Sequence, residues 1–137
     1  ASFYRCYICA DGKEIAVGAL EDQFYAELLE RIDAPAWLRE QRMDKARWPE
    51  QAEAFAALFA MRTRDEWCAL LEGTDACFAP VLTIGEAPRH PHMAARQVYV
   101  ERDGRAHVAP APRFSRTPSG INEGGDAEEL LKRWGAV

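Results

Sequence analysis

One carboxylate in this sequence, that of Glu21, is placed where a side chain could take part in proton transfer. It stands in the run 18–25, between a predicted β-hairpin and a predicted helix. Backbone on both sides would hold it, and its carboxylate would lie near the partial positive charge of a helix N-terminus. A rigidly held acid can transfer a proton. The alternative interpretation is an N-terminal capping residue, because acids are common at helix starts.

The histidines offer a second kind of chemistry. His90 and His92 are two residues apart in a predicted surface loop, and His107 lies on a predicted hairpin strand. None of the three has an acidic residue at a spacing that would orient an imidazole. We therefore expect ordinary polar residues here, not catalytic groups or metal ligands.

The four cysteines do not match a metal-binding pattern. Cys6 and Cys9 have C-x-x-C spacing, but an odd offset in a strand points the two thiols to opposite faces. Cys68 and Cys77 form no second pair of that spacing. We expect no metal site and reduced, mostly buried cysteines, which are typical of a reducing compartment such as the cytoplasm or an organelle matrix.

Composition limits the classes of partner. The 137 residues are 48% hydrophobic, which suits one modest domain with a buried core. A formal net charge of −5 argues against nucleic acid and anionic membranes as partners, because both attract basic surfaces. No apolar stretch approaches the roughly 20 residues that a membrane span needs. We expect a soluble protein.

The elements that would position Glu21 are a hairpin and a helix. The hairpin joins residues 3–9 to residues 14–18, and Asp11-Gly12 between them predicts a two-residue turn. Apolar residues at helical spacing predict a helix after Glu21, which ends at Asp33-Ala34-Pro35.

Further helices and strands follow along the chain. Trp48-Pro49 begins a second predicted helix, and the capping-box pattern Thr63-x-x-Glu66 begins a third, which ends at Gly73. The remaining predicted elements are an edge or irregular strand over 75–82 containing Pro80, a hairpin of 98–101 and 105–108 around Asp103-Gly104, and a terminal helix over 126–134. The order predicts an α+β fold, a small domain with antiparallel β-hairpins and about three to four helices.

Several runs along the chain, taken together, resemble one known family. They are Gly18-Ala19-Leu20-Glu21, Arg62-Thr63-Arg64-Asp65-Glu66-Trp67, Gly73-Thr74-Asp75-Ala76-Cys77, Ala79-Pro80-Val81-Leu82, Glu86-Ala87-Pro88 with His90-Pro91-His92, and 109–117. In order and spacing they resemble the α-methylacyl-CoA racemases of the family III CoA-transferase superfamily. The resemblance covers only that family's C-terminal portion. It implies the family's small domain over 1–117, followed by a linker and short helix over 118–137.

The resemblance implies a reaction and roles for three residues. The reaction is inversion at the α-carbon of a 2-methylacyl-CoA thioester through an enolate, which needs one group to remove the proton and another to return it. The family's glutamate, which supports a histidine, falls on Glu21. Tyr4 and Leu20 match positions that flank the acyl pocket, although a half-buried tyrosine and a core leucine are an equal interpretation. The acyl-CoA thioester is the substrate, and no cofactor is implied.

The resemblance also implies partners. The family's large nucleotide-fold domain, which binds most of the CoA and carries a catalytic aspartate and histidine, has no counterpart in this sequence. We expect it to come from the same parent chain or another subunit, and we expect a homodimer. The chain opens at Ala1 in strand-like sequence without a leader, as a fragment or processed product would. Alone, it should be inactive. A family III CoA-transferase fragment and a non-catalytic interaction module remain alternatives.

Basic residues and departures from the family pattern complete the sequence picture. The candidate contacts for phosphate or another domain are Arg62, Arg64, Arg113 and Arg116, with solvated surface arginines as the alternative. Arg5 stands where relatives usually carry an acid, and Ser2 where they often carry proline. Asp22 replaces a common proline and puts a second negative charge beside Glu21.

Overall fold

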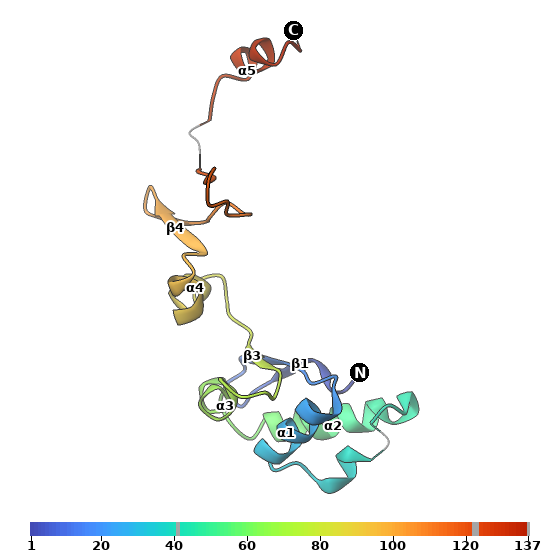
Figure 1. Cartoon of the computed structure of the whole chain (residues 1–137). Helices are drawn as coiled ribbons and strands as arrows, with labels where there is room; N and C mark the ends of the chain where they lie inside the picture. The colour runs from blue at the N-terminus through green and yellow to red at the C-terminus, as the bar shows by residue number, and fades with distance from the viewer. Residues whose placement is uncertain (41, 122–123, 137) are drawn as a thin grey trace. The chain divides into compact units, whose positions relative to one another are not determined.

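The computed structural model describes residues 1–40, 42–121 and 124–136. The chain divides into two compact units, Ala1–Thr83 and Ile84–Val137 (Figure 1). Among the described residues, the first unit contains a three-stranded sheet and three α-helices, and the second a two-stranded sheet and two shorter α-helices. Glu21 belongs to the first unit.

A small antiparallel sheet is the centre of the first unit. Its strands are β1 (Tyr4–Ile8), β2 (Glu14–Gly18) and β3 (Phe78–Pro80). The strand order is β1-β2-β3, and Tyr4 stands opposite Gly18 in the register of β1 and β2. Pro80 therefore lies on an edge strand, as predicted, where its missing N–H is tolerated.

The connection between β1 and β2 is one residue longer than the sequence predicts. The Cys9 amide donates to the Lys13 carbonyl at 2.8 Å, which leaves residues 10–12 as a three-residue loop. The Gly12 amide donates to the Cys9 carbonyl, and Gly12 has a φ of +75°. A tight turn followed by a residue in the left-handed region is a common three-residue hairpin loop. The predicted two-residue turn at Asp11-Gly12 is wrong in length, because Gly12 takes up the left-handed position after the turn.

Helices cover one face of this sheet. They are α1 (Asp22–Arg31), α2 (Trp48–Phe59) and α3 (Arg64–Leu71), with two short 3-10 helices, η1 (Ala36–Arg39) and η2 (Lys45–Arg47), between α1 and α2. The predicted helices agree with α1, α2 and α3. Asp33, with a φ of +51°, follows the end of α1, and Pro49 lies in the first turn of α2, where it breaks no hydrogen bond.

The capping box predicted at Thr63 and Glu66 fixes the start of α3. The Thr63 amide donates to the Glu66 carboxylate at 2.8 Å, and the Glu66 amide donates to the Thr63 hydroxyl at 3.3 Å. Hydrogen bonds from the Thr63 amide and hydroxyl stabilise the charged carboxylate and lower the pKa of Glu66. Trp67 and Leu71 consequently face the core, and both are buried.

Aromatic rings fill much of the core between the sheet and the helices. The ring centroids of Tyr7 and Phe59 lie 5.2 Å apart, and Phe59 meets Trp67 edge to face at 5.2 Å. Phe3 and Tyr25 meet edge to face at 5.8 Å. Such pairs add directional contacts to the burial of apolar area. They fix the sheet against α1, α2 and α3.

The second unit is smaller. Its elements are η3 (Ala87–Arg89), α4 (Pro91–Ala95), β4 (Tyr99–Arg102), β5 (Arg105–Val108) and α5 (Ala127–Arg133). β4 and β5 form the predicted hairpin, with φ of +52° at Asp103 and +70° at Gly104. Positive φ at both central residues is typical of the two-residue hairpin turn that the sequence predicts here.

The α+β fold with antiparallel hairpins is as predicted. The described residues contain five α-helices where about three to four were predicted, because α4 lies in a segment that the sequence indicated as a surface loop. His90 precedes α4 and His92 lies within it. Pro91 opens α4 at the one helical position where proline is favourable. The predicted domain limits, 1–117 and 118–137, stay a prediction, and residues 122, 123 and 137 lie outside the described residues.

Tyr25 should make the fold sensitive to alkaline pH. Its side chain is 2% exposed and its hydroxyl donates to the Leu38 carbonyl at 2.7 Å. Burial raises the pKa of Tyr25 to about 12, against the opposing effect of the Arg42 charge. An unfolded tyrosine ionises near pH ~10. The contribution of Tyr25 to stability is therefore full below about pH 10 and is lost as the pH rises toward about 12.

We expect Tyr25→Phe to reduce the free energy of unfolding by about 1 kcal/mol near neutral pH, because one hydrogen bond is lost. We also expect a smaller fall in stability above about pH 10 than in the native protein. A residual fall remains, because burial also raises the pKa of Tyr7. Urea unfolding at a series of pH values measures both effects. Tyr4→Phe, at an exposed position, should behave as native; an alkaline fall as steep in Tyr25→Phe as in native protein would contradict the prediction.

Candidate functional site

Glu21 lies at the junction between β2 and α1. Its backbone is extended, with φ −77° and ψ 146°, and it occupies the position just before the first residue of α1. The Tyr25 amide donates to the Glu21 carbonyl at 3.0 Å, so the first turn of α1 holds the main chain. In the described structure the Glu21 side chain is exposed and makes no capping hydrogen bond. Glu21 therefore occupies the N-cap position of the alternative interpretation, but without a side-chain capping hydrogen bond, and its side chain is exposed.

Arg42 forms hydrogen bonds with residues before and after Glu21. Its guanidinium donates to the carbonyl oxygens of Ala19 and Leu20. It also forms an ion pair with the Asp22 carboxylate. The second negative charge beside Glu21 is thus paired with a cation. No sequence pattern indicated this contact, because Arg42 lies 20 residues beyond Asp22 in a charged connecting segment.

The residues predicted to flank an acyl group lie close to Glu21. Tyr4 is 66% exposed and stands opposite Gly18, the last residue of β2. Leu20 is 50% exposed and follows Gly18 by two residues, immediately before Glu21. The alternative interpretation, a half-buried tyrosine and a core leucine, is wrong for both. The structure brings the three predicted site residues to one end of the β1-β2 hairpin.

The sheet face that carries Tyr4 has a shallow hollow of about 510 Å³. Its lining residues are Tyr4, Arg5, Cys6, Ala16, Val17, Gly18, Cys77, Phe78 and Ala79. A Cβ added at Gly18 would lie 3.6 Å from the Tyr4 ring, so the ring rests close to the bare backbone of β2. Small and apolar side chains at such a hollow can receive a hydrocarbon group.

Cys77 is one of the residues that line this hollow. The Gly18 amide donates to the Cys77 carbonyl at 2.8 Å, and Cys77 has a φ of +50°. The surrounding chain partly desolvates the thiol and raises the pKa of Cys77, and the negative charge of Glu21 is the next contribution to the rise. The charge of Glu21 thus contributes to the electrostatic environment of the Cys77 thiol.

The other cysteines divide as the strand geometry requires. Cys6 is exposed and Cys9 is buried, so the two thiols of the C-x-x-C run lie on opposite faces, as predicted. The expectation of mostly buried cysteines is wrong for Cys6 and Cys77, because both lie on the uncovered face of the sheet. All four cysteines are free thiols.

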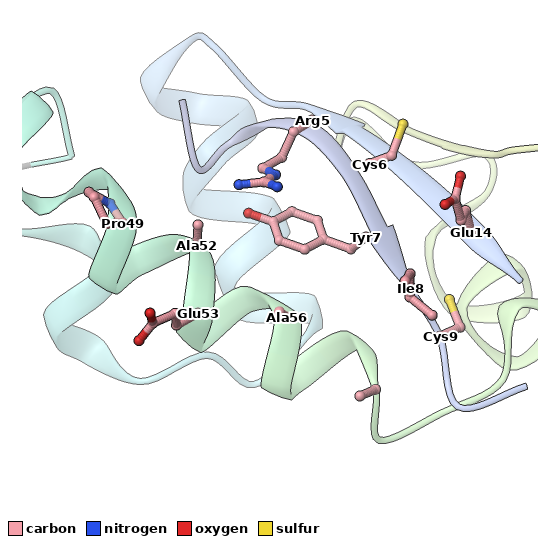
Figure 2. Close-up of a pocket in the computed structure, with 11 residues that line it drawn as sticks. Arg5, Cys6, Tyr7, Ile8, Cys9, Glu14, Pro49, Ala52, Glu53 and Ala56 are labelled. Carbon is pink, nitrogen blue, oxygen red and sulfur yellow. The ribbon is translucent and has the colours of Figure 1, made fainter. Parts of the chain in front are cut away.

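A second hollow, of about 690 Å³, lies between β1 and α2 (Figure 2). The Arg5 guanidinium lies 5.4 Å from the centre of the Tyr7 ring, and Ala52 and Ala56 of α2 face it across the hollow. The lining residues are Arg5, Cys6, Tyr7, Ile8, Cys9, Glu14, Pro49, Ala52, Glu53, Ala56 and Ala60. They include neither Glu21 nor a histidine, so this hollow is a separate feature of the unit.

Three of the four candidate phosphate-binding arginines make contacts within the protein. Arg64 is buried and donates to the Val81 carbonyl at 2.9 Å. The Arg62 guanidinium lies 5.1 Å from the centre of the Trp67 ring. Arg113 donates to the carbonyl oxygens of residues 96 and 97, just after α4. These contacts indicate structural roles for Arg64 and Arg113.

Other kinds of site find no support in the part of the chain that the structure describes. Within those residues, no group of three or more histidine, cysteine, aspartate or glutamate side chains could hold a metal ion. The same residues include no helix that is both long and apolar enough to span a membrane. The arrangement places the exposed carboxylate of Glu21 beside an apolar sheet face.

The link between Glu21 and Cys77 can be tested by thiol chemistry. We expect Glu21→Gln to make Cys77 react faster with iodoacetamide near neutral pH, because removing the negative charge lowers the pKa of the thiol and increases the thiolate fraction. Mass spectrometry of digested protein gives the alkylation rate of each cysteine. Cys6 is the internal reference, and Glu30→Gln is the control variant at an exposed glutamate of α1. An unchanged rate at Cys77 would contradict an effect of the Glu21 charge on this thiol.

Comparison with known proteins places this geometry in a family. The model of CoA-transferase family III matches residues 1–125. Alpha-methylacyl-CoA racemase of Mus musculus is 45% identical over 121 residues, which are 87% of this chain and 32% of the mouse protein. Alpha-methylacyl-CoA racemase of Homo sapiens is 38% identical over 145 residues, covering 98% of this chain and 37% of the human protein. The chain thus spans about a third of the length of these curated relatives.

The fold comparison agrees. The crystal structure of Rv3272 from Mycobacterium tuberculosis matches with a TM-score of 0.71 over 86% of this chain and 34% of that one. The identity is 17%, so this likeness concerns the fold alone. The resemblance predicted from the sequence is confirmed by the family model and by the racemases. The family model matches most residues of this chain, so the chain belongs to CoA-transferase family III.

Proposed function

We propose that this chain forms part of an α-methylacyl-CoA racemase, to which it contributes Glu21 and the sheet face beside it. The observation that carries the proposal is the exposed carboxylate of Glu21 at the rigid β2-α1 junction. The names of the mouse and human relatives give the reaction class. The substrate in this proposal is a 2-methylacyl-CoA thioester, and no cofactor takes part.

The reaction requires two proton-transferring groups. Breaking the α-C–H bond sends its electron pair toward the thioester carbonyl and forms an enolate, and inversion returns a proton to the opposite face of that planar carbon. Glu21 supplies a carboxylate that supports one of these two groups. Its role is to accept a hydrogen bond from a histidine in the rest of the protein and to stabilise the imidazolium that forms when the histidine takes the proton.

The sheet face beside Glu21 suits the acyl part of such a substrate. Tyr4 and Leu20 expose apolar surface at the end of the hairpin next to Glu21. The small residues of β2 and β3 leave a hollow on the same face. In this proposal the large domain comes from the same parent chain or another subunit, covers this face and completes the site, and the working protein is a homodimer.

A CoA-transferase is the second candidate. It is favoured by the family model's description and by a Caenorhabditis elegans relative, named as a CaiB/baiF CoA-transferase family protein, which is 29% identical over 110 residues. Transfer between carboxylic acids uses an acyl-accepting carboxylate as nucleophile. That reaction would depend on a carboxylate outside this chain, and removing the Glu21 charge would not abolish it.

A non-catalytic interaction module is the third candidate. The uncovered sheet face, with its exposed Tyr4, Ile8 and Leu20, is the observation that favours it. An exposed apolar face of this kind can bind another subunit. Under this reading, substitution of Tyr4 would weaken association and substitution of Glu21 would change no reaction.

The first test is exchange of the substrate's α-proton. In the protein at its full natural length, we expect Glu21→Gln to slow exchange from a 2-methylacyl-CoA into deuterated water by about 100-fold or more, the range for loss of acid–base catalysis. Mass spectrometry of the recovered thioester measures the rate. Glu30→Gln, on the exposed surface of α1, is the matched control and should exchange at the native rate. A native rate in Glu21→Gln, together with CoA transfer between acids, would favour the second candidate.

The isolated chain should not catalyse exchange. One carboxylate cannot both remove a proton from one face of an enolate and return it to the other. We therefore expect the 137-residue chain alone to give the background rate with a 2-methylacyl-CoA, and Glu21→Gln to leave that rate unchanged. Exchange above background by a preparation of confirmed intact mass would contradict this prediction.

A further inference from the structure

The main chain before Glu21 has carbonyl groups that neither the sheet nor the helix can satisfy. β2 ends at Gly18, and the first backbone bond of α1 uses the Glu21 carbonyl as acceptor for the Tyr25 amide. The carbonyls of Ala19 and Leu20 fall between these two systems. Ala19 is fully buried, and a buried carbonyl without a partner is costly.

Arg42 supplies the missing donors. One terminal nitrogen of its guanidinium donates to the carbonyls of Ala19 and Leu20, and the other donates to the Asp22 carboxylate. These acceptors lie immediately before and after Glu21. Only arginine has several donors in a planar fork that can serve acceptors in such a fixed arrangement.

Arg42 is itself firmly held. Its guanidinium carbon lies 5.0 Å from the centre of the Phe3 ring and 4.9 Å from that of Tyr25. Both rings belong to the core, and the Arg42 side chain is only 11% exposed. The Trp48 indole N–H donates to the Arg42 carbonyl at 2.9 Å, which ties its main chain to the start of α2. Core residues thus hold the Arg42 side chain where it contacts the β2-α1 junction.

We propose that Arg42 is a positioning residue for Glu21. It binds two backbone carbonyls before Glu21 and the side-chain carboxylate of Asp22 after it, and so aims the Glu21 carboxylate in one direction. The inference rests on the proposed function of Glu21. A displacement of about 1 Å in a catalytic group can cost about 100-fold in rate, so these contacts should matter to turnover more than to substrate binding.

Arg47 provides a matched control in the same connecting segment. Its guanidinium pairs with the Glu50 carboxylate at 3.0 Å and lies 5.5 Å from the centre of the Trp37 ring. Like Arg42, it combines an ion pair with an aromatic contact, but neither Glu50 nor Trp37 belongs to the β2-α1 junction. Arg47→Lys should therefore leave the junction unchanged.

The experiment compares Arg42→Lys with Arg47→Lys in the protein at its full natural length. Lysine keeps the charge but cannot serve carbonyls and carboxylate together in a fork. We expect Arg42→Lys to speed hydrogen exchange at the amides of Leu20 and Tyr25 by about tenfold, as measured by NMR. We also expect kcat for α-proton exchange to fall about tenfold or more while KM stays within about twofold. Arg47→Lys should change neither.

The Glu21→Gln background separates positioning from a general structural role. Because Arg42 acts through Glu21, Arg42→Lys should cause no further loss of kcat once Glu21 is glutamine. An equal loss in both backgrounds would overturn the proposal, as would unchanged hydrogen exchange at Leu20 and Tyr25. Should Arg42→Lys fail to fold, Asp22→Asn removes the negative charge that pairs with Arg42 and leaves the core intact, and it should loosen the same amides to a smaller degree.

The two proposals fail in different ways. If Arg42→Lys loosens the junction and Glu21→Gln retains the native rate, the hold of Arg42 on the junction is supported and the proposed role of Glu21 is overturned. If Glu21→Gln is inactive and Arg42→Lys has native kcat and native hydrogen exchange, the role of Glu21 stands and the inference about Arg42 is overturned.

Discussion

The structure of the first unit depends on burying only one face of a three-stranded sheet. Strand residues alternate between faces, so Tyr7, Ile15 and Val17 pack with the helices in one core. The outward-facing side chains of β1, those of Tyr4, Cys6 and Ile8, are exposed. The aromatic core fixes the sheet without using its outer face. That face is therefore both rigid and available, which is the combination that a binding surface needs.

The segment that follows β2 has backbone carbonyls that regular secondary structure leaves without donors. The chain passes from a strand to a helix within residues 19–21, and neither element satisfies the carbonyls of Ala19 and Leu20. The Arg42 guanidinium satisfies these carbonyls because it carries several N–H donors on one rigid group. Two other arginines also donate to backbone carbonyls. Arg64 donates to the Val81 carbonyl after β3, and Arg113 donates to carbonyls after α4. Arginine side chains thus hold the irregular segments that follow regular elements.

Features that depend on neighbouring residues could be predicted from the sequence. The capping box of Thr63 and Glu66, the helix start at Pro49 and the hairpin turn at Asp103-Gly104 each rest on contacts within a few residues. The place of Glu21 at a strand-to-helix junction was predicted in the same way, and its role stays a prediction.

The features that escaped prediction depend on tertiary contacts or on small energetic differences. Arg42 could not be recognised, because its acceptors lie 20 to 23 residues away and only the folded core brings them together. The length of the first hairpin loop was missed, since an Asp-Gly pair is compatible with both two-residue and three-residue loops. The short helix α4 was missed because Pro91 indicates a turn as readily as a helix start.

The departures from the family pattern gain a physical explanation from these tertiary contacts. The Ser2 hydroxyl donates to the Gln51 side-chain oxygen at 2.8 Å in a buried position. Arg5 lies over the Tyr7 ring. Asp22 adds a second negative charge beside Glu21, and like charges repel. Its ion pair with Arg42 offsets that charge, so the residue that replaces proline also anchors the guanidinium that holds the junction in place.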